Sequence, residues 1–175
     1  MIVLATGIQR SGSTWAYNVC RVSMNLAFGE DNVYWGWGVS PYEITKRHAI
    51  IKQHEPVWDR ELINKVVHTT RDYDECIQSM KEMFPDDPIT KHRIIVQDRF
   101  WSPLADVIIH HEDLLRSTVF CASLIVQALE LNVDPEEVDR QVNAIKIPET
   151  EEERETQLQV FYHPNHRRNR PHGRE

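Results

Sequence analysis

Long apolar segments and cysteines are both scarce in this sequence. No run of residues approaches the about 20 apolar residues of a membrane-spanning helix, so we expect no membrane partner. The three cysteines, Cys20, Cys76 and Cys121, are odd in number and far apart. This usage favours reduced thiols in a core over a disulfide framework, and it predicts a cytoplasmic location.

Positive charge is also in short supply. The chain has 20 Lys and Arg residues against 27 Asp and Glu residues, for a formal net charge of −7. A surface for nucleic acid needs a broad basic footprint, so this balance argues against a nucleic-acid partner. The arginines gather near the end of the chain, at Arg167, Arg168, Arg170 and Arg174.

The first residues show no pattern of an export signal. The apolar run Met1–Ala5 is too short for a secretory segment, lacks a basic flank and is followed at once by Gly7. We therefore interpret it as a strand. The length of 175 residues fits one domain spanning residues 1–175, with a basic tail at about 163–175.

Hydrophobic patterning predicts alternating strands and helices. The continuous apolar run at Ile2–Ala5 is typical of a buried parallel strand, and apolar residues at helical spacing begin at about Thr14. The other expected elements are strands at 49–52, 65–69 and 107–110, helices at 72–83, 114–131 and from 134 onward, a loop at 29–41 and a turn at 84–88. This order predicts an α/β sheet with helices on both faces, in which one short link between strands is a turn or crosses the sheet.

A glycine-containing segment, Gly7–Thr14, lies between the first predicted strand and the first predicted helix. Glycines permit a tight turn there, and the N–H groups and dipole of the helix start can hold an anion. The glycine spacing is that of a Walker A loop, but Ser13 occupies the lysine position, so an ATPase or kinase is disfavoured. Arg10 can supply the missing charge. The structural alternative is a plain turn.

Four segments together resemble the PAPS-dependent sulfotransferases, where PAPS is 3′-phosphoadenosine 5′-phosphosulfate. In chain order they are Arg10–Trp15, similar to the 5′-phosphosulfate loop; Ile51–Pro56, similar to the Lys-x-His-x-Pro strand end; Val66–Arg71 with Ser79, similar to the 3′-phosphate signature; and His111–Leu114, similar to the Tyr-Glu-Asp-Leu element. The resemblance implies a three-layer, doubly wound α/β fold with a mainly parallel sheet and a P-loop-like phosphate cradle.

The resemblance also implies a role for each candidate site residue. His54 is the expected general base, with Glu55 as the alternative, and Lys52 and Arg10 are expected to compensate charge on the transferring group. The residues expected to bind PAPS, or its product adenosine 3′,5′-bisphosphate, are Arg10, Ser11, Gly12, Ser13, Thr14, Trp15, Arg71 and Ser79. Trp15 is expected either to stack on adenine or to pack in the core. No metal is expected, because the histidines form no convincing ligand cluster.

The sequence differs from the family pattern in two respects, and it also allows two other functions. The chain is much shorter than typical members, and it lacks their C-terminal Arg-Lys-Gly segment in that form; the basic run Asn165–Arg170 is either a replacement or a disordered tail. The rivals are a small-molecule or nucleotide kinase and a non-catalytic nucleotide-binding module. The acceptor is expected to be a small molecule or a glycan, for which the aromatic residues Tyr34, Trp35 and Trp37 could form a wall. The sequence does not indicate the oligomeric state.

Overall fold

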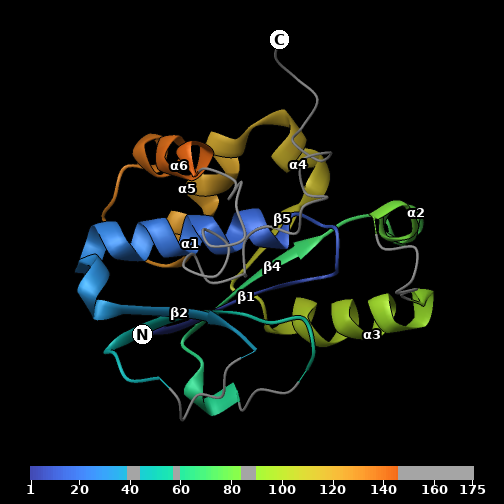
Figure 1. The fold of residues 1–175 in the computed structure, drawn as a ribbon, viewed down its shortest axis with the longest axis horizontal. Helices are drawn as coiled ribbons and strands as arrows, with labels where there is room; N and C mark the ends of the chain where they lie inside the picture. Colours follow the sequence, from blue (N-terminus) through green and yellow to red (C-terminus); the bar gives the residue numbers. More distant parts are fainter. Residues whose placement is uncertain (39–43, 57–59, 84–89, 146–175) are drawn as a thin grey trace, which may run out of the picture.

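The computed structural model describes residues 1–38, 44–56, 60–83 and 90–145. It contains one sheet whose five strands are all parallel, in the order β2-β3-β1-β4-β5 (Figure 1). The strands are β1 (Ile2–Gly7), β2 (Val33–Trp37), β3 (His48–Lys52), β4 (Lys65–Thr70) and β5 (Val107–His110). The helices are α1 (Ser13–Phe28), α2 (Tyr73–Met83), α3 (Lys91–Trp101), α4 (His111–Arg116), α5 (Thr118–Ala128) and α6 (Pro135–Ala144), with short 3₁₀ turns η1 (Glu30–Asn32), η3 (Arg60–Leu62) and η4 (Ser102–Leu104).

Helices cover the two faces of this sheet, which confirms the predicted three-layer α/β class. Figure 1 shows α1, α5 and α6 on one side of the strands and α3 on the other. The larger core cluster joins the first side of the sheet to these helices, through buried residues such as Val19 on α1 and Ile125 on α5. A smaller cluster on the opposite side contains Leu4, Ile51 and Trp101. β1 is a continuous apolar run because helices cover both faces of the sheet and bury its side chains on each side.

Several predicted helix starts and strands are confirmed. The Asp72 carboxylate accepts the N–H groups of Asp74 and Glu75 at 2.9 and 3.0 Å, and so caps α2. The Asp134 side chain accepts the N–H of Glu136 at the start of α6. The three cysteines are all buried free thiols, as the sequence predicted.

Other predictions were wrong. The segment predicted as a loop at 29–41 contains η1 and the whole of β2, whose aromatic side chains suit an edge strand paired with β3. The predicted helix at 114–131 is divided, because Ser117 has an extended backbone and its hydroxyl caps α5 by accepting the N–H of Phe120. Helix α3 was not predicted at all, and the turn predicted at 84–88 lies outside the described residues.

Candidate active site

The sequence-predicted residues come together at the carboxyl ends of three adjacent strands. β1 lies between β3 and β4, and ends in Gly7. β3 ends in Lys52 and leads to His54, while β4 ends just before Arg71. From β1 the chain passes to the edge strand β2, returns to β3 beside β1, and then crosses to β4 on the other side of β1. In open α/β sheets such a reversal of strand order is where ligands bind.

The turn after β1 has an unusual backbone. Gly7 has φ +153°, and a Cβ atom there would lie 2.1 Å from Thr69 Oγ1 and 2.9 Å from the Thr69 carbonyl oxygen. Arg10 has φ 71°, a left-handed conformation that non-glycine residues rarely adopt. Gly12 caps α1 with φ 93°. The glycines at 7 and 12 are therefore required by close packing and by backbone conformation.

The start of α1 offers N–H groups to a ligand. The first intrahelical bond is donated by Ala16 to the carbonyl of Gly12, so the N–H groups of Ser13, Thr14 and Trp15 have no acceptor within the helix. The N–H of Ser11 is already used, because it donates to the Ile8 carbonyl at 3.2 Å. The Ser11 hydroxyl also turns inward, donating to the Ile8 carbonyl at 2.6 Å. Ser11 thus closes the turn, and the N–H groups without an acceptor in the helix belong to the residues after it.

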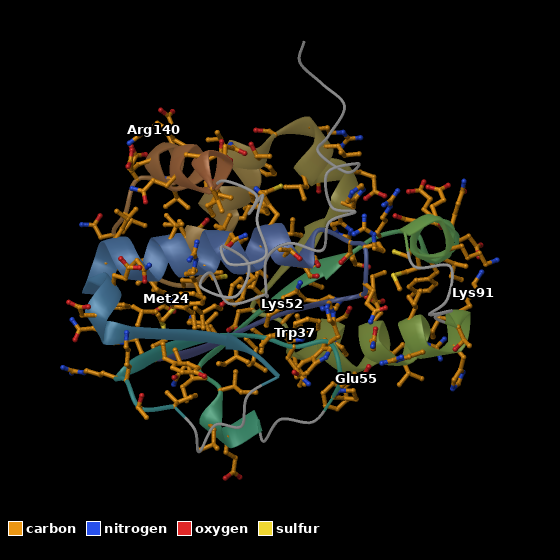
Figure 2. All side chains as sticks on the ribbon, viewed as in Figure 1. Met24, Trp37, Lys52, Glu55, Lys91 and Arg140 are labelled. Atoms are coloured by element: carbon orange, nitrogen blue, oxygen red, sulfur yellow. The ribbon has the colours of Figure 1, made fainter. Side chains whose placement is uncertain are left out.

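Lys52 is a buried cation that reaches the turn from the neighbouring strand. Its side chain is 6 % exposed, and Nζ donates to the Thr14 hydroxyl at 2.6 Å. Nζ also lies 5.5 Å from the centre of the Trp37 ring, and no carboxylate among the described residues forms an ion pair with it. Burial, and then the positive charge of Arg10, lower the pKa of Lys52 to about 8. Figure 2 shows Lys52 and Trp37 beside each other at the centre of the molecule.

His54 is buried next to Lys52. The imidazole is 8 % exposed, and Nδ1 lies 2.6 Å from the Gly7 carbonyl oxygen. A carbonyl oxygen only accepts, so Nδ1 carries the proton and Nε2 of the neutral ring carries the lone pair that can accept one. Burial and Lys52 outweigh the Gly7 hydrogen bond and Glu55, and lower the pKa of His54 to about 4. The ring is therefore neutral at physiological pH.

Arg10, Arg71 and Ser79 form a second group beside the turn. Arg10 Nε donates to the Ser79 hydroxyl at 3.1 Å, and Arg71 donates to the Arg10 carbonyl at 3.3 Å. Arg71 also pairs with Glu75 at 2.8 Å, whereas Arg10 has no carboxylate partner among the described residues. Burial and the nearby Arg71 lower the pKa of Arg10. Two adjacent cations with one neutralising carboxylate in the described part of the chain form a local positive field within an acidic protein.

Trp15 and Glu55 are the remaining candidate residues from the sequence. Trp15 packs against the larger core cluster, and its indole N–H is buried without a partner among the described residues. Glu55 accepts hydrogen bonds from Arg93 Nε at 3.0 Å and Gln97 Nε2 at 2.9 Å, both on α3. Sequence reasoning missed these two residues together with α3. Their spacing of four residues, continued by Trp101, was the signal that could have found them.

The described residues contain neither a cluster of metal ligands nor a membrane-spanning helix. In the described ranges, no three or more His, Cys, Asp or Glu side chains gather where they could hold a metal ion. No helix described in the structure has both the length and the apolar character needed to cross a bilayer.

Comparison with known proteins places the fold. No protein-family model matches the chain, and no curated protein sequence does. Among solved structures it is similar to a retinol dehydratase in a complex with retinol and PAP, with a TM-score of 0.50 and 14 % sequence identity. This likeness shows the fold alone. The match covers 83 % of this chain and 64 % of the length of the retinol dehydratase chain.

Proposed function

We propose that this chain is a sulfotransferase that transfers a sulfuryl group from PAPS to a hydroxyl or amine of a small-molecule or glycan acceptor. One observation carries the proposal: a buried lysine, with no carboxylate partner among the described residues, is hydrogen-bonded to the turn after β1, beside a buried and neutral histidine. The structural neighbour was solved with PAP, which supports the same class of ligand for this fold.

The residues of the turn fit the 5′ end of such a nucleotide. Free N–H groups at the start of α1 are suited to an anion, and Arg10 and Lys52 are cations that no described carboxylate neutralises. Arg71 and Ser79 are the candidates for the 3′-phosphate, because their polar groups lie against Arg10 on the β4 side of the turn. When bound, PAPS supplies the sulfuryl group to be transferred.

Lys52 and His54 would have different tasks in this reaction. Lys52, held by Thr14, would stabilise negative charge at the phosphosulfate. His54 would take the proton of the attacking hydroxyl on Nε2, because the Gly7 carbonyl already holds the proton on Nδ1. A pKa of about 4 keeps the ring ready to accept a proton at neutral pH, although it also makes the ring a weak base. Glu55 remains the alternative base.

Trp37 is the candidate wall for the acceptor. It ends β2, is 55 % exposed, and lies edge-on to the His54 ring with 6.2 Å between ring centroids. An exposed aromatic face next to the proposed base suits an acceptor that presents a planar or apolar surface near its hydroxyl.

The test is titration calorimetry followed by a transfer assay. We expect adenosine 3′,5′-bisphosphate to bind much more tightly than 5′-AMP, with no change when Mg²⁺ is removed, and we expect labelled sulfate to move from PAPS to one member of an acceptor panel. Tight binding of ATP that requires Mg²⁺ would instead indicate a kinase. Bisphosphate binding without transfer to any acceptor would indicate a non-catalytic module.

A further inference from the structure

The segment that carries the candidate base has little regular structure of its own. β3 ends at Lys52, and residues 53–56 belong to no helix or strand. One backbone bond, from the N–H of Gln53 to the Ala5 carbonyl at 3.1 Å, ties the segment to β1. The position of the imidazole therefore depends on contacts from outside the segment.

Helix α3 supplies these contacts from one face. Trp101 donates its indole N–H to the His54 carbonyl at 2.9 Å, and the Glu55 carboxylate accepts from Arg93 and Gln97. Arg93, Gln97 and Trp101 are four residues apart, so they lie along the same side of the helix. Figure 2 shows Glu55 close to the ribbon of α3.

The two innermost of these side chains, Gln97 and Trp101, are buried. Trp101 is 1 % exposed and packs against Leu4 and Ile51 under the sheet. Gln97 is fully buried, and its Oε1 has no partner within the described residues, so its one described hydrogen bond is to Glu55. A buried amide with an unpaired acceptor is costly, by about 1–3 kcal/mol.

The helix is itself fixed to the sheet through Asp98. One carboxylate oxygen of Asp98 lies 2.9 Å from His68 Nε2, and the other accepts the Tyr73 hydroxyl at 2.8 Å. His68 is fully buried on β4, and its Nδ1 lies 3.0 Å from the Thr6 hydroxyl on β1. Thr6 precedes Gly7, whose carbonyl holds His54 Nδ1. β1 therefore contacts the imidazole at its ring and α3 contacts its backbone, and Asp98 and His68 link these two elements.

We propose that Trp101 is a positioning residue for His54, and that the α3 face of Arg93, Gln97 and Trp101 holds the imidazole with Nε2 available to the acceptor. The role of this face in catalysis rests on the proposed sulfotransferase function. The orientation of the His54 ring does not rest on that function, because it can be measured in the protein without substrate.

The experiment compares Trp101→Phe with Phe100→Leu. Trp101→Phe keeps an apolar ring but removes the N–H donor, whereas Phe100→Leu changes the exposed neighbouring ring and leaves the donor in place. For Trp101→Phe we expect kcat to fall about tenfold or more, with the KM for PAPS and the affinity for the bisphosphate within about twofold of the wild type. Phe100→Leu should retain the wild-type kcat.

Nuclear magnetic resonance of the His54 ring nitrogens is the second readout. The wild type should show the proton on Nδ1, and Trp101→Phe should show a mixture of the two tautomers. Wild-type kcat and tautomer in Trp101→Phe would overturn the positioning role and leave the sulfotransferase proposal intact. A lower kcat with an unchanged tautomer would also overturn it, because the effect would then not act through His54.

A wild type that neither binds the bisphosphate nor transfers sulfate would refute the proposed function, and the tautomer comparison would still decide the positioning role. If Trp101→Phe does not fold, Gln97→Leu replaces it, since it removes the amide that holds Glu55. We expect Gln97→Leu to lower kcat at least threefold without changing the affinity for the bisphosphate. Wild-type kcat and tautomer in Gln97→Leu would then overturn the proposal.

Discussion

Lys52 gives the sharpest test of the anion site, because its charge depends on what is bound. In the free protein burial and Arg10 lower its pKa to about 8 from an ordinary 10.5. A phosphate or phosphosulfate next to Nζ would favour the charged ammonium and move the pKa back up. Binding at mildly alkaline pH should therefore take up a proton.

The expected size follows from the two pKa values. At pH 8 Lys52 is about half protonated in the free protein and almost fully protonated in a complex that restores 10.5, so uptake is about 0.5 proton per complex. At pH 9 uptake rises to more than about 0.8 proton. Because binding takes up a proton, the affinity for the bisphosphate should fall as pH rises, by about tenfold between pH 7 and pH 9. The phosphates themselves, with a second pKa near about 6, are already deprotonated in this range.

Calorimetry at pH 8 in two buffers of different ionisation enthalpy measures the uptake directly. Lys52→Arg should bind the bisphosphate with no uptake, because a guanidinium stays protonated. Lys65→Met is a matched control, since Lys65 pairs with Glu130 at the surface and its loss should leave the uptake unchanged. If the wild type takes up no proton and its affinity is constant from pH 7 to pH 9, Lys52 does not contact the anion.

Three further outcomes are expected. Arg71→Ala should weaken the bisphosphate by about 2 kcal/mol, or about 30-fold, and 5′-AMP far less, as measured by calorimetry; equal losses would contradict the 3′-phosphate assignment. His54→Ala should lower turnover about 100-fold with unchanged donor affinity, whereas full activity in His54→Ala together with inactivity in Glu55→Gln would make the glutamate the base. Gly7→Ala should destabilise the fold by about 2 kcal/mol in chemical denaturation, because its Cβ would lie 2.9 Å from the Thr69 carbonyl, and an unchanged midpoint would show that the turn relaxes freely.

The local features of the site could be predicted from the sequence. The apolar run, the glycines and the helix after them follow short-range rules, so the turn at 7–14 lies where it was expected. The helix caps at Asp72 and Asp134 depend on residues only two or three positions away. The parallel sheet followed from the alternation of elements, apart from β2.

What the sequence could not provide was set by tertiary packing. β2 was hidden because its glycine and aromatic residues become a strand only when paired with β3. α3 was hidden because polar residues such as Arg93 and Gln97 fill the face that contacts the site, which weakens the hydrophobic pattern. Burial and Lys52 lower the pKa of His54, whereas the hydrogen bond to the Gly7 carbonyl and the charge of Glu55 raise it, and only the fold shows that burial is the largest effect.

The strand order explains how this turn could work without a lysine of its own. A Walker A loop carries its cation on the loop, at the position that Ser13 occupies here. In this fold β3 lies directly beside β1, with Ala5 opposite Lys52 in the register, so a lysine at the end of β3 reaches the Thr14 hydroxyl from the side. A cation fixed by the sheet would approach a bound anion from the side of β3, where His54 also lies. The charge would thus act at the end of the phosphosulfate nearest the proposed base, which is where charge must be compensated in a group transfer.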